Sequence, residues 1–230
     1  MDKTRWIIFT VVTVGILTSL VIFSSSSKIK VDTIDTNTIQ IASSQNGNIA
    51  DHVFGKKDSK VILIEYGDYQ CPPCGSMHPS IKSISEQYKD KILFIFRNFP
   101  IPSLHPNARA AAATVEAAGL QGKYWEMHNN VFETQNSWSN LNGNERTKFF
   151  ESLAEKLGLD ITKYNNNLAD TFIGKKIDFD YALGKKADVN ATPTFFLNGE
   201  KLDPSDYGDA KKLKDTINIE LKKASISLPK

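Results

Sequence analysis

Hydrophobic residues along this chain form one long uncharged run near its beginning and several shorter runs after residue 59. The long run extends from Trp6 to Phe23 and contains no charged side chain. As an α-helix rising about 1.5 Å per residue it would reach roughly 27 Å, close to the thickness of a bilayer's hydrocarbon core. Lys3 and Arg5 precede the run, and positive charges favour the cytoplasmic side of a membrane. We therefore predict a single-pass transmembrane anchor over residues 6–23, with residues 1–5 in the cytoplasm and the rest outside it.

A cleaved signal peptide is the alternative explanation of this run. The apolar region of a signal peptide usually extends over about 7–15 residues, which is shorter than the run here. The small residues Ser24 to Ser27 nevertheless offer a place for cleavage. Both explanations place the remaining chain outside the cytoplasm. Residues 24–49 are rich in Ser, Thr, Asn and Asp, so we predict a tether there, with a short strand near residues 38–42.

The shorter hydrophobic runs predict buried strands and the helices between them. Compact apolar stretches with β-branched or aromatic residues are typical of buried strands, and Asn198-Gly199 is a hairpin turn signal. Apolar residues at helical spacing, with Gly and Pro at the breaks, predict the helices. The predicted strands cover residues 60–66, 91–99, 193–198 and 200–202, and the predicted helices cover 77–89, two segments within 106–136, 144–157, 161–170, 171–186 and 204–224.

The order of these elements predicts an α/β fold. A strand–helix–strand unit comes first, a strand–strand–helix unit comes last, and several helices lie between them. This order resembles the thioredoxin layout with a helical insertion. We predict one such domain over residues 50–224, an insertion over about 104–187 and a C-terminal tail over 225–230.

Composition and charge exclude several other classes of protein. The 230 residues are 40% hydrophobic, enough for a sizeable core, and the net charge is only +2. A nucleic-acid binder needs clustered cations to neutralise phosphates, and the 28 basic and 26 acidic residues are mixed along the chain. We expect no nucleic-acid partner. We also expect a monomer, because the sequence has no separate dimerisation domain.

The chain has two cysteines, Cys71 and Cys74, separated by Pro72 and Pro73 at the junction of a predicted strand and helix. A helix start offers unpaired N–H groups and the positive end of the helix dipole, which stabilise a thiolate. We therefore expect Cys71 to have a lowered pKa, to be exposed and to react, and Cys74 to be more buried and to resolve the mixed disulfide. A structural staple is the weaker alternative, because so short a ring constrains little of the unfolded chain. No cofactor is needed, because the sulfur pair itself carries two electrons.

A metal-binding pair is a further alternative for the two cysteines. A tetrahedral zinc site would need two more ligands, and His78 lies one helical turn after Cys74. A surface histidine is the simpler interpretation of His78, so we predict no metal ligand. Trp125, Met127 and His128 have the spacing of core residues, which favours packing over any cofactor contact.

Glu65 and His105 are weaker candidates for chemistry. Glu65 lies inside a predicted apolar strand, where a carboxylate is costly without a partner or a raised pKa. It is interpreted as a functional acid, the alternative being a solvated glutamate at a sheet edge. His105 could line the active-site face, although helix capping is the simpler account.

Three segments stand out in order along the chain: residues 67–74 (GDYQCPPC), 105–135 and 190–199 (NATPTFFLNG). Together they resemble the DsbA-like thiol–disulfide oxidoreductases of the thioredoxin superfamily, above all the membrane-anchored BdbD-type disulfide-formation proteins of bacteria. The resemblance implies a cis Thr192-Pro193 peptide bond facing the cysteines, with the Thr192 backbone open to pair with an extended substrate; a trans proline opening an edge strand is the alternative. It also implies that Glu65 accepts a proton near the buried cysteine.

The resemblance implies an oxidase that donates the Cys71–Cys74 disulfide to exported proteins with free thiols. A membrane partner linked to quinones would restore the disulfide. Pro72-Pro73 departs from the Pro-His dipeptide of the best-known oxidases, so the redox direction is open. A reductase using the same residues, a metal-delivery module using Cys71, Cys74 and His78, and a non-catalytic scaffold are the alternatives.

Overall fold

The computed structural model describes residues 29–229. The predicted anchor over residues 6–23, and with it the alternative of a signal peptide, lies outside the described residues. Within residues 29–229, no helix is both long and apolar enough to span a bilayer. From Val31 onward the chain forms one compact unit.

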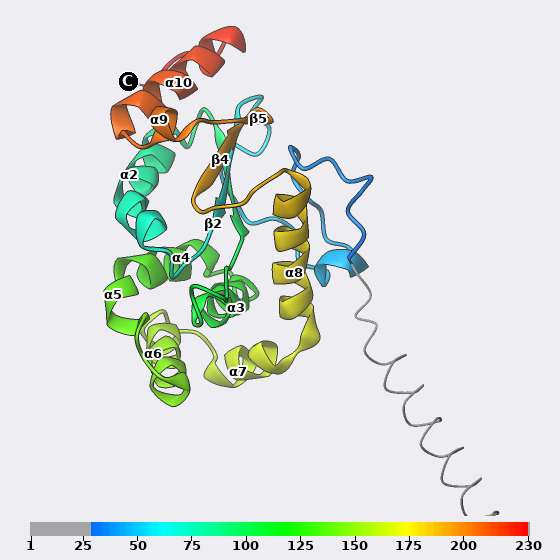
Figure 1. The fold of residues 1–230 in the computed structure, drawn as a ribbon, viewed down its shortest axis with the longest axis vertical. Coiled ribbons are helices and arrows are strands. Elements are labelled where there is room, and N and C mark those ends of the chain that lie inside the picture. The colour runs from blue at the N-terminus through cyan, green and yellow to red at the C-terminus, as the bar shows by residue number, and fades with distance from the viewer. Residues whose placement is uncertain (1–28, 230) are drawn as a thin grey trace, which may run out of the picture. The chain divides into compact units, whose positions relative to one another are not determined.

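A five-stranded mixed sheet lies at the centre of this unit (Figure 1). The strand order is β1-β3-β2-β4-β5, with β2 and β3 parallel and the other pairs antiparallel. The central strands β2 and β3 are almost fully buried, as expected for strands that are covered on both faces. The strands are β1 Val53–Gly55, β2 Ile62–Gly67, β3 Leu93–Asn98, β4 Thr194–Leu197 and β5 Glu200–Lys201.

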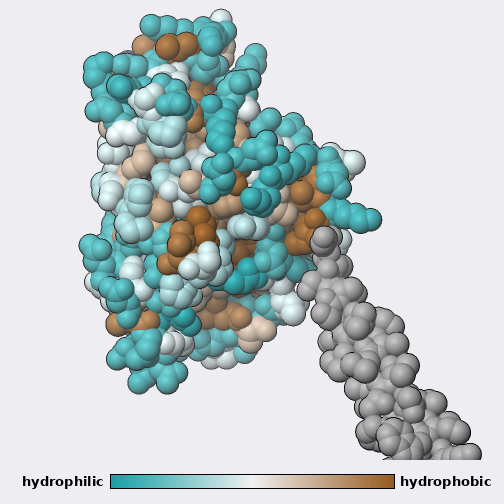
Figure 2. Space-filling view, in the orientation of Figure 1, coloured by the Kyte–Doolittle hydropathy of each residue, from teal (hydrophilic) through white to brown (hydrophobic). Residues whose placement is uncertain are grey.

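Helices cover the sheet and form the insertion between β3 and β4. Figure 1 shows α2, α9 and α10 on one side of the sheet and α8 on the other. The face of the molecule seen in Figure 2 is largely hydrophilic, with smaller apolar patches between the polar side chains. The helices are α2 Pro72–Tyr88, α3 Ala108–Gly119, α4 Tyr124–Glu133, α5 Gln135–Trp138, α6 Gly143–Lys156, α7 Ile161–Ala169, α8 Thr171–Lys186, α9 Pro204–Tyr207 and α10 Ala210–Lys223.

These elements confirm the predicted α/β fold with its helical insertion, and they correct three details. The predicted final helix over 204–224 is two helices, since α9 ends at Tyr207 and Asp209 caps the start of α10 with bonds to two backbone N–H groups. The edge strand β1 was not predicted, because three residues carry little periodic signal. Residues 38–42 form no strand.

The prediction of a tether over residues 24–49 is wrong for its second part, because residues 31–49 pack against the domain. The ammonium of Lys186 on α8 donates hydrogen bonds to the carbonyl oxygens of Val31, Asp32 and Ile34, at 3.0, 2.7 and 2.6 Å. The short 3-10 helix η1, Ser44–Asn46, lies against α8 (Figure 1). The polar segment that suggested a tether instead supplies backbone carbonyls to side-chain cations of the domain. The domain therefore begins near residue 31 and not at residue 50.

A buried cluster of charges fastens this segment to the core. Arg97 on β3 donates to Asp51 Oδ2 at 2.7 Å, and Lys176 on α8 donates to Asp51 Oδ1 at 3.0 Å and Asp180 Oδ1 at 2.7 Å. Arg97 also donates to the carbonyls of Thr36 and Thr38. Burial raises the pKa of Asp180 to about 6, although Lys176 opposes the shift. These charged groups are shielded from water, so each needs its partners in the cluster to stabilise its charge.

Candidate active site

The two cysteines lie at the start of α2, as predicted. Cys71 is the N-cap residue, and Pro72 and Pro73 occupy the first two helical positions, where a missing N–H costs nothing. Both prolines are exposed, whereas both sulfurs belong to buried residues. The backbone N–H of Cys71 donates to the carbonyl of Asp68 at 3.0 Å, which closes the turn between β2 and α2.

Cys71 is the more acidic of the two thiols. A hydrogen bond from the Cys74 thiol is the largest influence on the pKa of Cys71. Together with the Cys74 N–H, it lowers this pKa to about 6, against burial and the Asp68 charge. The expectation of an exposed Cys71 is wrong, because only 5% of the residue is exposed. The Thr192 loop covers it, with the Cys71 thiol donating to the Thr192 carbonyl at 3.2 Å.

Cys74 has the opposite environment. It is 1% exposed, and burial raises its pKa well above the ordinary value, with further contributions from Cys71 and Glu65. At neutral pH the pair therefore consists of an ionised Cys71 and a protonated Cys74. This is the asymmetry that thiol–disulfide exchange requires, because one sulfur attacks or is attacked and the other resolves.

The Thr192-Pro193 peptide bond is cis, as the resemblance implied. Its loop faces the cysteines, since the Thr192 carbonyl accepts the bond from Cys71. Tyr207 on α9 holds the loop by donating from its hydroxyl to the Pro193 carbonyl at 3.0 Å, and its ring packs on Phe195. Sequence reasoning missed Tyr207, because one aromatic residue after a loop gives no pattern.

Glu65 lies on the central strand β2, between β3 and β4, so the alternative of a solvated glutamate at a sheet edge is wrong. It is 4% exposed. Burial and then the Cys71 charge raise its pKa to about 8. Glu65 therefore carries a proton at neutral pH beside the cysteine pair. Gly67, without a side chain, leaves room for its carboxyl group.

A groove of about 370 Å³ begins at Pro72 and runs between α2 and the α4–α5 corner. Its walls combine exposed polar side chains with the ring of Phe132. Gln135 lies on its wall and bonds the Cys71 carbonyl. The lining residues are Pro72, Gly75, Ser76, His78, Pro79, Phe132, Glu133, Gln135 and Asn136.

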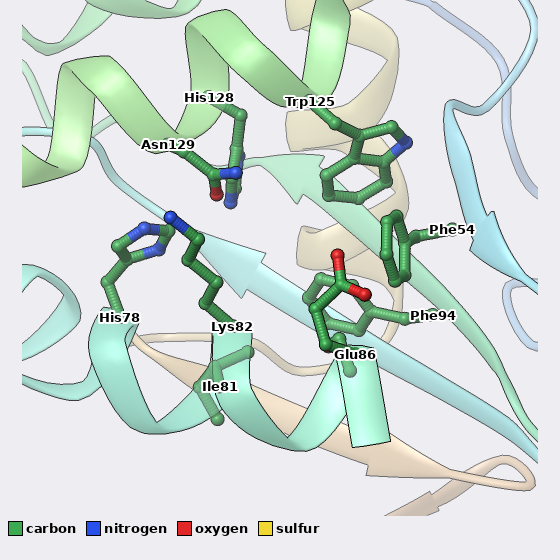
Figure 3. Close-up of a pocket in the computed structure, with 10 residues that line it drawn as sticks. Phe54, His78, Ile81, Lys82, Glu86, Phe94, Trp125, His128 and Asn129 are labelled. Atoms are coloured by element: carbon green, nitrogen blue, oxygen red, sulfur yellow. The ribbon is translucent and has the colours of Figure 1, made fainter. Parts of the chain in front are cut away.

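His78 is not a surface residue, and the metal alternative finds no support in the described residues. It is 5% exposed, stacks on Phe132 and faces His128, with ring centroids 5.3 Å apart. Figure 3 shows both histidines in a pocket between α2 and α4, together with Trp125. Burial lowers the pKa of His78 to about 4. Among residues 29–229, no group of three or more His, Cys, Asp or Glu side chains is placed to hold a metal ion.

The other core candidates also lie where packing was expected. Met127 and His128 are buried, and Trp125 packs against the core. His128 also bonds through Nδ1 to the Tyr69 hydroxyl, at 2.8 Å. His105 caps no helix, since α3 begins at Ala108; its Nδ1 lies 2.8 Å from Asp68 Oδ2, next to the active-site turn.

Sequence reasoning missed the polar residues that hold the turn before Cys71. Asp68 is 1% exposed and accepts hydrogen bonds from the N–H groups of Gln70 and Ile101. The Gln70 side chain bonds the Asn107 N–H and the Ser139 carbonyl, which ties the turn to the insertion. Long-range bonds of this kind leave no periodic signal. Only the presence of Asp68 and Gln70 in the segment before Cys71 could have drawn attention to them.

This fold is that of the DsbA-like thiol–disulfide oxidoreductases. A family model described as Thioredoxin matches residues 47–216, so the chain belongs to the thioredoxin family. The α-DsbA1 structure from Wolbachia pipientis is similar with a TM-score of 0.66 and 27% identity, over 76% of this chain and 92% of that one. BdbD from Bacillus subtilis is similar with a TM-score of 0.64 and 25% identity, over 80% of this chain and 98% of that one.

The curated relatives that this chain matches are larger proteins. The Na(+)/H(+) antiporter NhaA 1 of Salinispora arenicola is 35% identical over 151 residues, 66% of this chain and 22% of the antiporter. The NhaA 1 protein of Mycolicibacterium vanbaalenii is 34% identical over 153 residues, 65% of this chain and 23% of that protein. The chain thus spans about a fifth of the length of these relatives.

Proposed function

We propose that this protein is an extracytoplasmic thiol–disulfide oxidase that donates the Cys71–Cys74 disulfide to exported proteins. A substrate thiolate attacks the Cys71 sulfur, and Cys74 leaves. A second substrate thiolate then attacks the substrate sulfur of the mixed disulfide, and Cys71 leaves as a thiolate. The substrate loses two electrons and gains a disulfide, and the enzyme ends as a dithiol.

The place of Cys71 at the start of α2, beside the Cys74 thiol that lowers its pKa, is the observation that carries this proposal. A thiol with a pKa of about 6 is mainly ionised at pH 7, and this ionisation stabilises the reduced form. Each unit by which the pH exceeds the pKa of Cys71 stabilises the reduced form by about 1.4 kcal/mol. For a two-electron couple this corresponds to roughly 30 mV in the reduction potential. The shift makes the disulfide more oxidising and Cys71 a good leaving group.

Glu65 completes the proton transfer at the buried sulfur. Cys74 leaves into an environment that disfavours its charge, so it needs a proton. Glu65 holds a proton at neutral pH and lies close enough to raise the pKa of Cys74. When the dithiol is reoxidised, Cys74 must lose the proton, and Glu65 accepts it once its own proton has left.

The Thr192 backbone is the proposed binding element for substrates. Its carbonyl faces Cys71, and Pro193 next to it keeps the loop free of an N–H that would pair within the fold. An extended substrate segment pairs with this backbone and brings its own cysteine to the Cys71 sulfur. The exposed Pro72 and Pro73 border the approach.

The proposed location is the outer face of the cell membrane, with the uncharged run over residues 6–23 as the anchor. A membrane thiol oxidase linked to quinones would take the two electrons and restore the disulfide. An oxidising compartment suits a protein of this chemistry.

A redox titration tests the proposal. The purified protein is equilibrated with glutathione buffers, and the dithiol fraction is measured by alkylation, with Cys71→Ser as the control that forms no internal disulfide. We expect a potential closer to the approximately −120 mV of the strong oxidant DsbA than to the roughly −270 mV of thioredoxin. A value near that of thioredoxin would instead identify a reductase.

A further inference from the structure

Gln135, at the start of α5, joins the helical insertion directly to the backbone of Cys71. Its Nε2 donates hydrogen bonds to the carbonyl oxygens of Tyr69 and Cys71, at 2.8 and 2.9 Å. Gln135 is 9% exposed, so these bonds are largely shielded from water. One amide thus bridges two carbonyls on either side of Gln70, in a turn that lacks regular backbone pairing.

The Cys71 carbonyl is the junction between this amide and α2. It also accepts the N–H of Gly75 at 3.1 Å, the first hydrogen bond within the helix. A side chain at residue 75 would collide with Gln135 Oε1, so Gly75 is what allows the amide to lie this close. Gln135 and Gly75 are therefore complementary, and together they fix the orientation of the Cys71 peptide group.

The orientation of this peptide group decides where the Cys71 sulfur lies. The Cys71 sulfur lies 3.2 Å from the Thr192 carbonyl oxygen, and the thiol and the N–H of Cys74 stabilise the charge of the thiolate. Rotation of the Cys71 backbone would move the sulfur away from these groups. Hydrogen bonds to an ionised sulfur weaken steeply with distance and angle.

We propose that Gln135 is a positioning residue that holds Cys71 in the geometry in which its sulfur is stabilised as a thiolate. Gln135 donates only to backbone carbonyls, and it acts through the Cys71 backbone. This inference rests on the proposed function of the cysteine pair and adds that the insertion, and not only the thioredoxin core, sets the reactivity of the pair.

The test compares Gln135→Met, which keeps the size of the side chain but removes both donors, with Gln135→Glu, which adds a negative charge. Gln121→Met is the matched control, because Gln121 also bonds backbone groups within the insertion, both of them on Asp160, away from the cysteines. The reduced proteins are titrated by the ultraviolet absorbance of the thiolate and by the pH dependence of alkylation.

We expect the Cys71 midpoint to rise by about half a unit to one unit in Gln135→Met and further in Gln135→Glu. Gln121→Met should keep the native midpoint. A rise in Gln135→Glu alone would overturn the inference, since it would reflect only the added charge, and so would an unchanged midpoint in both variants. An ordinary cysteine midpoint in the native protein would instead contradict the proposed function, whatever the variants show.

Discussion

The sulfur of Cys71 lies 3.2 Å from the carbonyl oxygen of Thr192, a residue 121 positions further along the chain. The same loop that is proposed to bind the substrate therefore covers the reacting sulfur. As a thiolate or in the disulfide, Cys71 has no proton to donate, so this carbonyl is left free to accept a hydrogen bond from an incoming backbone. Substrate binding and the loss of the Cys71 proton are thus linked through one acceptor.

Replacing Cys74 by Ala should make Cys71 less acidic. The Cys74 thiol is the largest source of stabilisation for the Cys71 thiolate, so its removal should raise the alkylation midpoint of Cys71 above about 6. Stopped-flow alkylation across pH 4 to about 10 would measure the shift. In Cys71→Ser, the buried Cys74 should alkylate slowly at neutral pH. A midpoint that stays near 6 in Cys74→Ala would contradict this assignment.

Replacing Glu65 by Gln should slow the proton-dependent step by about 100-fold, within the range of general acid–base catalysis. The readout is the rate at which the reduced enzyme is reoxidised by a small disulfide. In the native protein the Glu65-dependent part of this rate should increase through about pH 8, where the carboxylate forms. A Glu65→Gln enzyme that keeps this pH dependence would show that another group takes the proton.

Glu65→Gln should also make the reduced protein more stable than the native protein at alkaline pH, where native Glu65 is ionised. The pKa of Glu65 is raised from 4.5 to about 8, so between these values the folded state holds a proton that the unfolded state has lost. Stability therefore falls as pH rises through this window, by about 1.4 kcal/mol per unit at most, and levels off above it. Urea unfolding at two pH values in the window should show a smaller decline for Glu65→Gln than for the native protein.

Replacing Asp51 by Asn should destabilise the fold by about 3–5 kcal/mol, because it leaves two buried cations with too little negative charge. Arg97 and Asp51 are each fully buried at the side chain, so solvent cannot compensate. Asp215→Asn is the control, since its pair with Lys211 is exposed and should matter by less than about 1 kcal/mol. Equal losses of unfolding free energy in the two variants would show that the buried cluster stabilises the fold no more than an exposed ion pair does.

Reduction should raise the melting temperature of the native protein. The Cys71 thiolate stabilises the dithiol form relative to the disulfide form. Each 30 mV by which the potential is more oxidising corresponds to about 1.4 kcal/mol of this difference in stability. In a domain of this size, 1 kcal/mol shifts the melting temperature by roughly 2–4 °C. Calorimetry with and without reductant measures the difference. A higher melting temperature for the disulfide form would favour the reductase.

The sequence predicted the redox pair and most of the fold because these features are local. Cys71 and Cys74 lie three positions apart, and the long helices and buried strands have clear periodicity or composition. The groups that tune the pair come from distant segments: Gln135 from the insertion and Thr192 from the loop before β4. The exposure of Cys71 and the burial of His78 were mispredicted for the same reason, since a neighbouring loop or helix covers each.

The packing of residues 31–49 has a consequence for the order in which the chain assembles. Lys186, which holds the carbonyls of Val31, Asp32 and Ile34, follows them by 155, 154 and 152 positions. A chain that emerges with its amino end first exposes these carbonyls long before their partner arrives. The earliest part of the domain is therefore among the last to become fixed, and folding of this edge waits for nearly the whole domain to emerge.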